Sequence, residues 1–159
     1  MTTETLDRPD GLAGQPEFGE VYARVQHFYA HQMQLFDRHD ADGWAATFTQ
    51  DAVFSVPTLD APVRGRAHLA ANVLRNRRRQ EDSGEQHRHW IGMLDVRPGP
   101  DGALRTRCYA LVYVTPRGGS SRLLRVCVME DELVPGEGGW LTRRRVVTRD
   151  DLACGRGTA

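Results

Sequence analysis

The sequence contains no lysine, and all 21 of its basic residues are arginine. Mechanisms that need a lysine amine are therefore excluded, among them a Schiff base with a carbonyl substrate and the P-loop contact to a nucleotide phosphate. The formal net charge is zero, because 21 acidic residues balance the arginines. Without an excess of positive charge, the chain lacks the general electrostatic attraction on which binding to nucleic acids or anionic membranes depends.

Cysteines and long apolar runs are also scarce. The three cysteines, Cys108, Cys127 and Cys154, are an odd number and do not have the spacing of a metal site. No apolar run approaches the roughly 20 residues of a membrane span, and no signal peptide is visible. We therefore expect a cytoplasmic protein with reduced thiols.

The length and composition of the chain indicate one globular domain. The chain has 159 residues, of which 40% are hydrophobic and 26% charged, both ordinary for a globular protein. Residues 1–15 have no hydrophobic periodicity, so we expect a flexible tail there, and residues 155–159 are expected to form a second tail. The domain itself is expected to span residues 16–154.

Apolar residues at helical spacing predict a first helix over residues 17–39. Asp42 can cap a short second helix that carries Trp44 and Phe48, and a third helix is expected over residues 66–80. The arginine run at residues 75–79 lies at the end of this third helix. Because cations suit a helix C-terminus, we favour a solvated helix end over a binding role for this run.

Alternating apolar residues predict five strands. The first covers residues 51–56, and a meander of four strands, separated by glycine- and proline-rich turns, follows near residues 87–96, 104–115, 121–133 and 140–148. Helices followed by a meander predict an α+β domain with the helices on one face of the sheet. The third strand of the meander is long, and a bend or bulge in it would curl the sheet.

Several short motifs, taken in order, resemble the SnoaL-like branch of the NTF2-like superfamily. Residues 36–44 precede a strand that begins Asp51-Ala-Val-Phe54, and the likeness continues at Val63-Arg-Gly-Arg66, at His87-Arg-His-Trp-Ile-Gly92 and on the last strand, at residues 139–145. The resemblance covers about residues 18 to 150. It implies a cone-shaped fold in which a curved, mostly antiparallel sheet and three helices enclose a pocket.

The functions of that superfamily are diverse. They include polyketide cyclases, scytalone dehydratase, ketosteroid isomerases, epoxide hydrolases, small subunits of ring dioxygenases and members without a catalytic role, so the fold alone does not determine function. Residues 28–33 and 88–93 resemble small proteins of aromatic polyketide pathways in actinomycetes. The resemblance implies a cofactor-independent cyclase or dehydratase acting on an aromatic polyketide intermediate in secondary-metabolite biosynthesis. The alternative is a non-catalytic ligand-binding or auxiliary protein that assists a pathway oxygenase.

The resemblance places Asp37 near the end of the first helix and His89 on the facing strand. A carboxylate beside an imidazole fixes its tautomer and raises its basicity, which makes a general acid and base for proton transfer next to a carbonyl. A structural His89 and a solvated Asp37 are the alternative. In an unbroken helix Asp37 lies away from the apolar stripe and Asp40 lies near its edge, so Asp40 is a second candidate, unless it only caps local backbone.

Other residues are candidates for binding. In the family the position of Tyr109 faces the pocket, where a phenol could donate a hydrogen bond to a developing enolate; sheet packing is the alternative. Arg125 and Arg144 would suit an anionic or phenolate ligand, although surface positions are the commoner case for strand charges. An apolar pocket for a flat polycyclic ligand, or simply a core, would be formed by Trp44, Phe48, Phe54, Trp90 and Met93.

No metal or other cofactor is expected. His87 and His89 share a face of the sheet, but no third ligand follows at a recognisable interval. The expected partners are a small aromatic or polyketide ligand and a second copy of the chain, because members of this superfamily often dimerise through the sheet and tyrosine and arginine suit an interface. Neither nucleic acid nor a membrane is expected to bind.

Overall fold

Three helices and a six-stranded sheet form the domain in a computed structural model that describes residues 17–152. The two expected tails lie outside these described residues. The chain runs, with one 3-10 turn at Pro100–Gly102, through α1 (Phe18–Asp37), α2 (Ala41–Ala46), β1 (Phe48–Ser55), β2 (Val63–Arg64), α3 (Arg66–Ser83), β3 (Glu85–Pro98), β4 (Leu104–Pro116), β5 (Arg122–Gly136) and β6 (Gly139–Arg149). The predicted order of helices and meander is confirmed.

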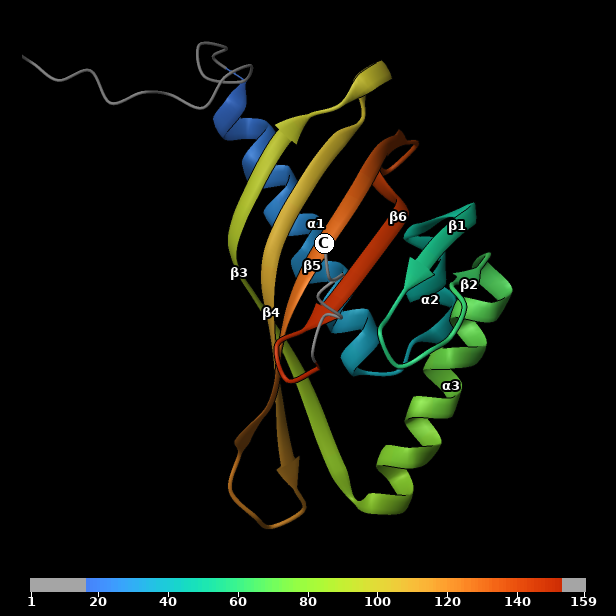
Figure 1. The fold of residues 1–159 in the computed structure, drawn as a ribbon, viewed down its shortest axis with the longest axis vertical. Coiled ribbons are helices and arrows are strands. Elements are labelled where there is room, and N and C mark those ends of the chain that lie inside the picture. Colours follow the sequence, from blue (N-terminus) through green and yellow to red (C-terminus); the bar gives the residue numbers. More distant parts are fainter. Residues whose placement is uncertain (1–16, 153–159) are drawn as a thin grey trace, which may run out of the picture.

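The sheet is curved and mostly antiparallel, as predicted (Figure 1). Its strand order is β2-β1-β6-β5-β4-β3, and the pairing of β1 with β6 is parallel. The pairing register shifts between Val112 and Tyr113 where β4 meets β5, and between Glu132 and Leu133 where β5 meets β6. The first shift leaves Leu124 of the long strand β5 without a partner, which agrees with the bulge expected there, and the second leaves Arg143 of β6 without one. Both irregularities favour curling of the sheet.

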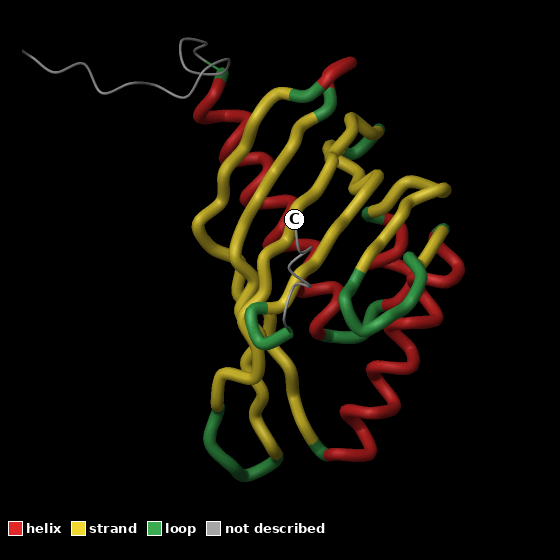
Figure 2. The backbone as a smooth tube through the Cα atoms, viewed as in Figure 1, coloured by secondary structure: helices red, strands yellow, loops and turns green. Residues whose placement is uncertain are grey.

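The helices cover one side of this sheet (Figure 2). Helix α1 crosses the central strands, and α2 and α3 lie beside β1. Within the described residues, none of the helices combines the length and the apolar character that a membrane crossing requires.

The helix ends differ from the sequence-based expectation. Helix α2 ends at Ala46, so Phe48, which was expected on this helix, begins β1 instead. Asp40, and not Asp42, caps α2, because its Oδ1 accepts a hydrogen bond from the Gly43 N–H at 2.9 Å. Helix α3 continues to Ser83 and ends at Gly84, whose φ of 66° suits glycine. The arginine run at residues 75–79 therefore precedes the last turn, and the expected match between this run and the helix dipole is wrong.

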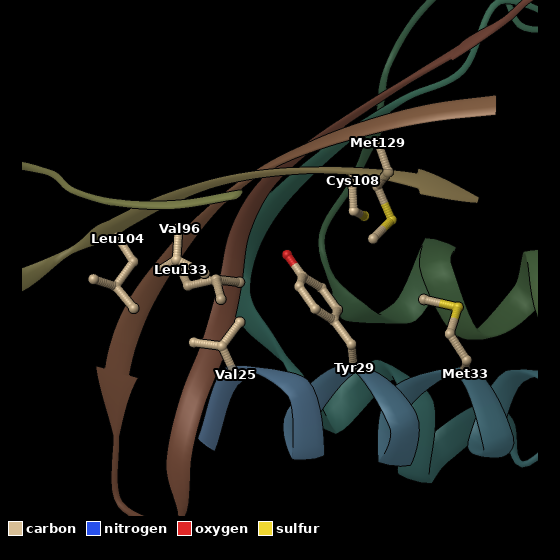
Figure 3. Packing of buried hydrophobic residues seen from close by; sticks show 8 residues of the cluster. All are labelled: Val25, Tyr29, Met33, Val96, Leu104, Cys108, Met129 and Leu133. Atoms are coloured by element: carbon tan, nitrogen blue, oxygen red, sulfur yellow. The ribbon is translucent and has the colours of Figure 1, made fainter. Parts of the chain in front are cut away.

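The main apolar core lies between α1 and the sheet (Figure 3). Val25, Tyr29 and Met33 project from α1 toward the strands, where they meet Val96, Leu104, Cys108, Met129 and Leu133. A second cluster joins α2, β1 and α3, and consists of Leu35, Ala41, Trp44, Phe48, Ala52, Leu69 and Val73. Met33 of α1 belongs to the first cluster and Leu35 to the second, so the end of α1 packs against both the meander and α3.

A buried ion pair lies beside the main core. Arg145 on β6 donates from Nε to Asp131 Oδ1 at 2.9 Å and from Nη2 to Oδ2 at 2.6 Å, and both side chains are almost fully buried. Burial by itself lowers the pKa of Arg145, but the Asp131 carboxylate outweighs it and the pKa is raised. The guanidinium is therefore charged in the folded protein.

Helix α1 is joined to this ion pair by two side chains. Tyr29 donates from its hydroxyl to Asp131 Oδ2 at 2.9 Å, and Gln32 Oε1 accepts from Arg145 Nη2 at 2.5 Å. Gln32 Nε2 donates onward to Thr47 and Thr142. Burial raises the pKa of Tyr29 well above its usual value, so the phenol keeps its proton. The network connects α1 with β5 and β6.

We expect Asp131→Asn to lower the free energy of unfolding by about 3–5 kcal/mol, because it leaves the Arg145 guanidinium buried without its counter-ion. Urea denaturation followed by circular dichroism measures the change. Glu130→Gln is the matched control: it breaks an exposed ion pair with Arg107 at 2.8 Å, and should cost less than about 1 kcal/mol. If the two variants lost the same free energy of unfolding, the buried pair would be no more important to the fold than an exposed pair.

Candidate active site

A cavity of about 580 Å³ lies between α3 and the inner face of the sheet. Its apolar walls come from the end of α1, from α2 and from the strands, and include Met33, Phe36, Trp44, Phe54 and Ile91. This volume is within the range of small-molecule sites. The cavity is therefore the candidate site in the described part of the chain.

Asp37 and His89 form a close pair at this cavity. Asp37 is the last residue of α1, where β3 runs past the helix end. Its Oδ1 lies 2.6 Å from His89 Nδ1, and its Oδ2 accepts from the His89 backbone N–H at 3.0 Å. The carboxylate thus holds both the strand and the ring, although its position lies off the apolar stripe of the helix.

The geometry of this pair determines which ring nitrogen is free. A carboxylate acceptor at Nδ1 fixes the proton there, which leaves Nε2 as the basic nitrogen. His89 lines the cavity, and its side chain is 19% exposed. Phe36 packs its ring edge-on against the imidazole at 5.0 Å. The arrangement can accept a proton at Nε2 and stabilise the resulting imidazolium.

Asp40, the alternative carboxylate, is not at the cavity. It caps α2, and its Oδ2 lies 3.6 Å from Arg38 in an exposed ion pair. The structure therefore brings Asp37, and not Asp40, to His89.

A second histidine faces the cavity two residues earlier on β3. His87 Nε2 lies 3.3 Å from Glu85 Oε2, and both residues line the cavity. Within residues 17–152, no group of three or more His, Cys, Asp or Glu side chains is arranged to hold a metal ion.

The expected pocket positions of Tyr109, Trp90 and Met93 are wrong. Side chains alternate along a strand, and on β4 the inward residues are Cys108, Ala110 and Val112. Tyr109 is 48% exposed on the opposite face, so its phenol cannot donate into the cavity. Trp90 follows the inward His89 and points outward, and Met93 is exposed where the pairing of β3 with β4 is irregular.

The expected pocket role of Arg144 is also wrong, for a related reason. Leu133 pairs with Thr142 and Glu132 with Arg144, which leaves Arg143 without a partner in the register. This extra residue shifts the alternation by one, so Arg144 is exposed and Arg145 is buried and lines the cavity. Arg145 and Asp131 were not among the residues predicted from the sequence.

The other expected binding residues lie as follows. Trp44 and Phe54 line the cavity, whereas Phe48 is buried in the core behind it, with its ring 5.3 Å from the Arg145 guanidinium carbon. Arg125 lines the cavity, and its Nε is buried without a hydrogen-bond partner in the described part of the chain. The same holds for the indole N–H of Trp44.

The cavity face of α3 carries residues that the sequence analysis did not assign to the site. Arg75 and Arg79 line the cavity together with Asn72, Asn76 and Gln80. Residues spaced three and four apart lie on the same face of a helix, so this polar stripe could have been recognised in the sequence.

Neither described cysteine is suited to act as a nucleophile. Burial raises the pKa of the Cys108 thiol to about 12. Cys127 lines the cavity, and burial raises its pKa as well. Because the thiolate is the reactive form, both thiols are unreactive near neutral pH.

Comparisons with known proteins agree with this architecture. Residues 19–146 match the SnoaL-like domain. The structure of Aln2 from a Streptomyces species is 35% identical over 86% of this chain and 94% of that chain, with a TM-score of 0.77. A Catenulispora acidiphila protein, solved in complex with S-DNPA, is 34% identical over 83% of this chain and 95% of that chain, with a TM-score of 0.71.

The fold also occurs at lower identity. An NTF2-like protein with a cystatin-like fold from Novosphingobium aromaticivorans is 22% identical over 94% of this chain and 95% of that chain, with a TM-score of 0.74. It shows the fold alone. Among curated proteins, no significant match is found.

We expect nuclear magnetic resonance of the ¹⁵N-labelled protein to show His89, when neutral, protonated at Nδ1 and free at Nε2. Asp37→Asn offers only one oxygen for the two donors of His89, so the ring should become a mixture of tautomers. His68 is the control, because its Nδ1 contacts the Arg64 carbonyl at 2.9 Å and not Asp37. A proton on Nε2 of His89 in the unsubstituted protein would contradict the assigned roles.

Proposed function

The chain belongs to the SnoaL-like domain family, and on that premise we propose that it is a cofactor-independent enzyme that cyclises or dehydrates an aromatic polyketide intermediate. The observation that carries the proposal is the Asp37–His89 pair at 2.6 Å, with the ring facing a cavity of about 580 Å³. A buried carboxylate and an imidazole with one free nitrogen are the parts that proton transfer beside a carbonyl requires.

In dehydration, His89 Nε2 removes a proton from the carbon next to a ketone. The C–H electron pair forms the new double bond as the β-hydroxyl leaves, and the proton from Nε2 completes the water molecule. In cyclisation, removal of the same proton gives an enolate, and the enolate carbon attacks a second ketone. The alkoxide formed from that ketone takes the proton back from Nε2. Neither route changes the oxidation state of the substrate, so acid and base groups suffice.

The enolate oxygen needs a hydrogen-bond donor inside the cavity. Tyr109 faces outward, so this role falls to another group. Trp44 lines the cavity, but its indole nitrogen has almost no accessible surface, so a ligand in the cavity does not reach this N–H. The arginines of the lining are the remaining charged donors, and preorganised positive charge stabilises an enolate as it develops.

The walls of the cavity support a flat aromatic ligand. Trp44 lies between Phe36 and Phe54, with ring centroids 4.9 and 6.1 Å away. Such rings can pack against the faces and edges of fused rings. The Catenulispora acidiphila relative, whose structure holds S-DNPA, supports small-molecule binding in this part of the family.

We expect His89→Ala and Asp37→Asn each to lower turnover by about 10²–10⁴-fold, because each removes part of the acid and base pair. The substrates are a panel of aromatic poly-β-ketones and fused-ring β-hydroxy ketones, and mass spectrometry follows the loss of water without added cofactor. His31→Ala, on the exposed side of α1, is the control and should keep full turnover.

The same experiment separates the alternative function. Compounds that bind and return unchanged, with equal affinity for the protein and the His89→Ala variant, would contradict the enzymatic proposal. They would favour a binding or auxiliary protein that holds a pathway intermediate for an oxygenase.

A homodimer through the outer face of the sheet is the second part of the proposal. Tyr109, Tyr113, Trp90 and Leu123 are 37–68% exposed there. Pairing places Trp90 beside Leu111 and Tyr113 beside Leu123, so the apolar residues gather across β3, β4 and β5. An aromatic patch of this kind is typical of a protein interface.

We expect Trp90→Glu to convert the dimer to a monomer, because a charge would be buried in the apolar interface. Size-exclusion chromatography with light scattering measures the mass. Leu74→Glu is the matched control, since Leu74 is a similarly exposed apolar residue on α3. A monomeric unsubstituted protein would refute the dimer.

A further inference from the structure

The charges that line the cavity are strongly unbalanced. Within residues 17–152, the side chains that line the cavity include a single acidic residue, Glu85, and five arginines: Arg75, Arg79, Arg125, Arg145 and Arg149. Glu85 lies beside His87. The excess of positive charge is unexpected in a chain whose formal net charge is zero.

Two of these arginines are neutralised by the protein itself. Arg145 is bound to Asp131. Arg149 donates from Nε to Asp151 Oδ1 at 2.9 Å and from Nη2 to Oδ2 at 2.5 Å, so both oxygens of that carboxylate are engaged.

The other three, Arg75, Arg79 and Arg125, have no ion pair or side-chain hydrogen bond within residues 17–152. The Nε of Arg125 is also buried. A buried guanidinium N–H without an acceptor is costly, and so is the mutual repulsion of cations that share a cavity. Nε itself is closed to a ligand, but a negatively charged acceptor at the terminal guanidinium nitrogens of Arg125 would offset its charge and lessen the repulsion.

The helix opposite Arg125 provides further donors on one face. Arg75 and Arg79 are one turn apart on α3, and Asn72 and Asn76 share their side of the helix. On the other side, Arg77 pairs with Glu81 at 2.7 Å, so that arginine is already neutralised. Arg75 and Arg79 are thus cations of α3 that line the cavity and have no carboxylate partner within residues 17–152.

The register of the sheet gives the distance from Arg125 to the imidazole of His89. His89 pairs with Val112, and Val112 pairs with Arg125, so the three stand side by side across β3, β4 and β5. Neighbouring strands are about 4.8 Å apart, which separates the backbones of His89 and Arg125 by roughly 10 Å. Arg125 therefore lies across the cavity floor from the proton-transfer group.

We propose that the cavity binds its ligand as an anion: a carboxylate on the aromatic ligand is held by the Arg125 guanidinium, with Arg75 and Arg79 at the rim. A guanidinium fork matches the two oxygens of a carboxylate. The ligand then lies across the sheet, with its carboxylate at β5 and its reacting carbon at His89 on β3. This inference rests on the proposed function only in taking the cavity as the ligand site, because the anion contact needs no chemistry.

The test compares two probes of nearly the same shape by isothermal titration calorimetry: 3-hydroxy-2-naphthoate, which is an anion, and 3-hydroxy-2-naphthamide, which is neutral and has an NH2 donor in place of one carboxylate oxygen. We expect the unsubstituted protein to bind the carboxylate about 10- to 100-fold more tightly than the amide, as charge-assisted hydrogen bonds imply. Arg125→Gln should remove most of that preference and leave binding of the amide unchanged. Arg122→Gln, an exposed position on the same strand that does not line the cavity, should keep the preference.

The rim is tested in the same way on α3. We expect Arg75→Gln with Arg79→Gln to weaken carboxylate binding and its sensitivity to sodium chloride. Arg78→Gln is the control, since this neighbour of Arg79 does not line the cavity. Thermal melting of each variant confirms that the domain is folded.

The outcomes separate the two proposals. Equal binding of both probes to the unsubstituted protein, or an unchanged preference in Arg125→Gln, would overturn the anion site and leave the small-molecule cavity standing. Failure of both probes to bind would overturn both the anion site and the use of this cavity as a small-molecule site.

Discussion

The buried pair of Arg145 and Asp131 is the interaction on which the arrangement of the site depends. The two residues are direct partners in the register of β5 and β6, and Tyr29 and Gln32 connect α1 to them. A charge pair with this burial is tolerated only when its hydrogen bonds are made, because desolvation can exceed the Coulomb attraction. The pair therefore specifies how α1 lies on the sheet more than it adds stability. Because Asp37 ends this helix, the same constraint brings the carboxylate to His89.

The site has two chemically different ends on one sheet. At β3, a single carboxylate engages both the backbone N–H and the ring Nδ1 of His89, so the imidazole has one free nitrogen and little freedom to rotate. At β5, Arg125 has a buried donor without an acceptor. The hydrogen-bond donors at the first end have acceptors within the described part of the protein, whereas the buried donor at the second end has none. A proton-transfer group benefits from such preorganisation, whereas an unsatisfied cation is what a ligand-binding group requires.

The sequence predicted the elements far better than the directions of individual side chains. Periodicity identified three helices and the meander, and the motif at residues 36–44 pointed to Asp37. Tyr109, Trp90 and Arg144 were assigned to the cavity but face outward. Trp90 and Tyr109 directly follow the inward residues His89 and Cys108, so plain alternation turns them outward, against the position that the family resemblance implied. For Arg144 the cause is a bulge, which shifts the alternation by one residue and moves every later side chain to the other face. On β6 the extra residue is Arg143, in a run of three arginines, so no change in residue type marks it. Buried partners distant in sequence, such as Asp131 and Arg145, leave no local pattern at all.

The outward direction of Tyr109 changes how the proposed chemistry must work. A phenol in the cavity would stabilise an enolate by one neutral hydrogen bond, and the protein could then remain indifferent to the charge of its ligand. Without that phenol, the charged donors that remain in the lining are the guanidinium groups. Cations in a site with few counter-charges lower the energy of any anion that forms there. The arginines that would hold a carboxylate would therefore also favour enolate formation at His89. Binding and proton transfer would then rely on the same positive field, which the arginines of the lining supply in a chain with zero net charge.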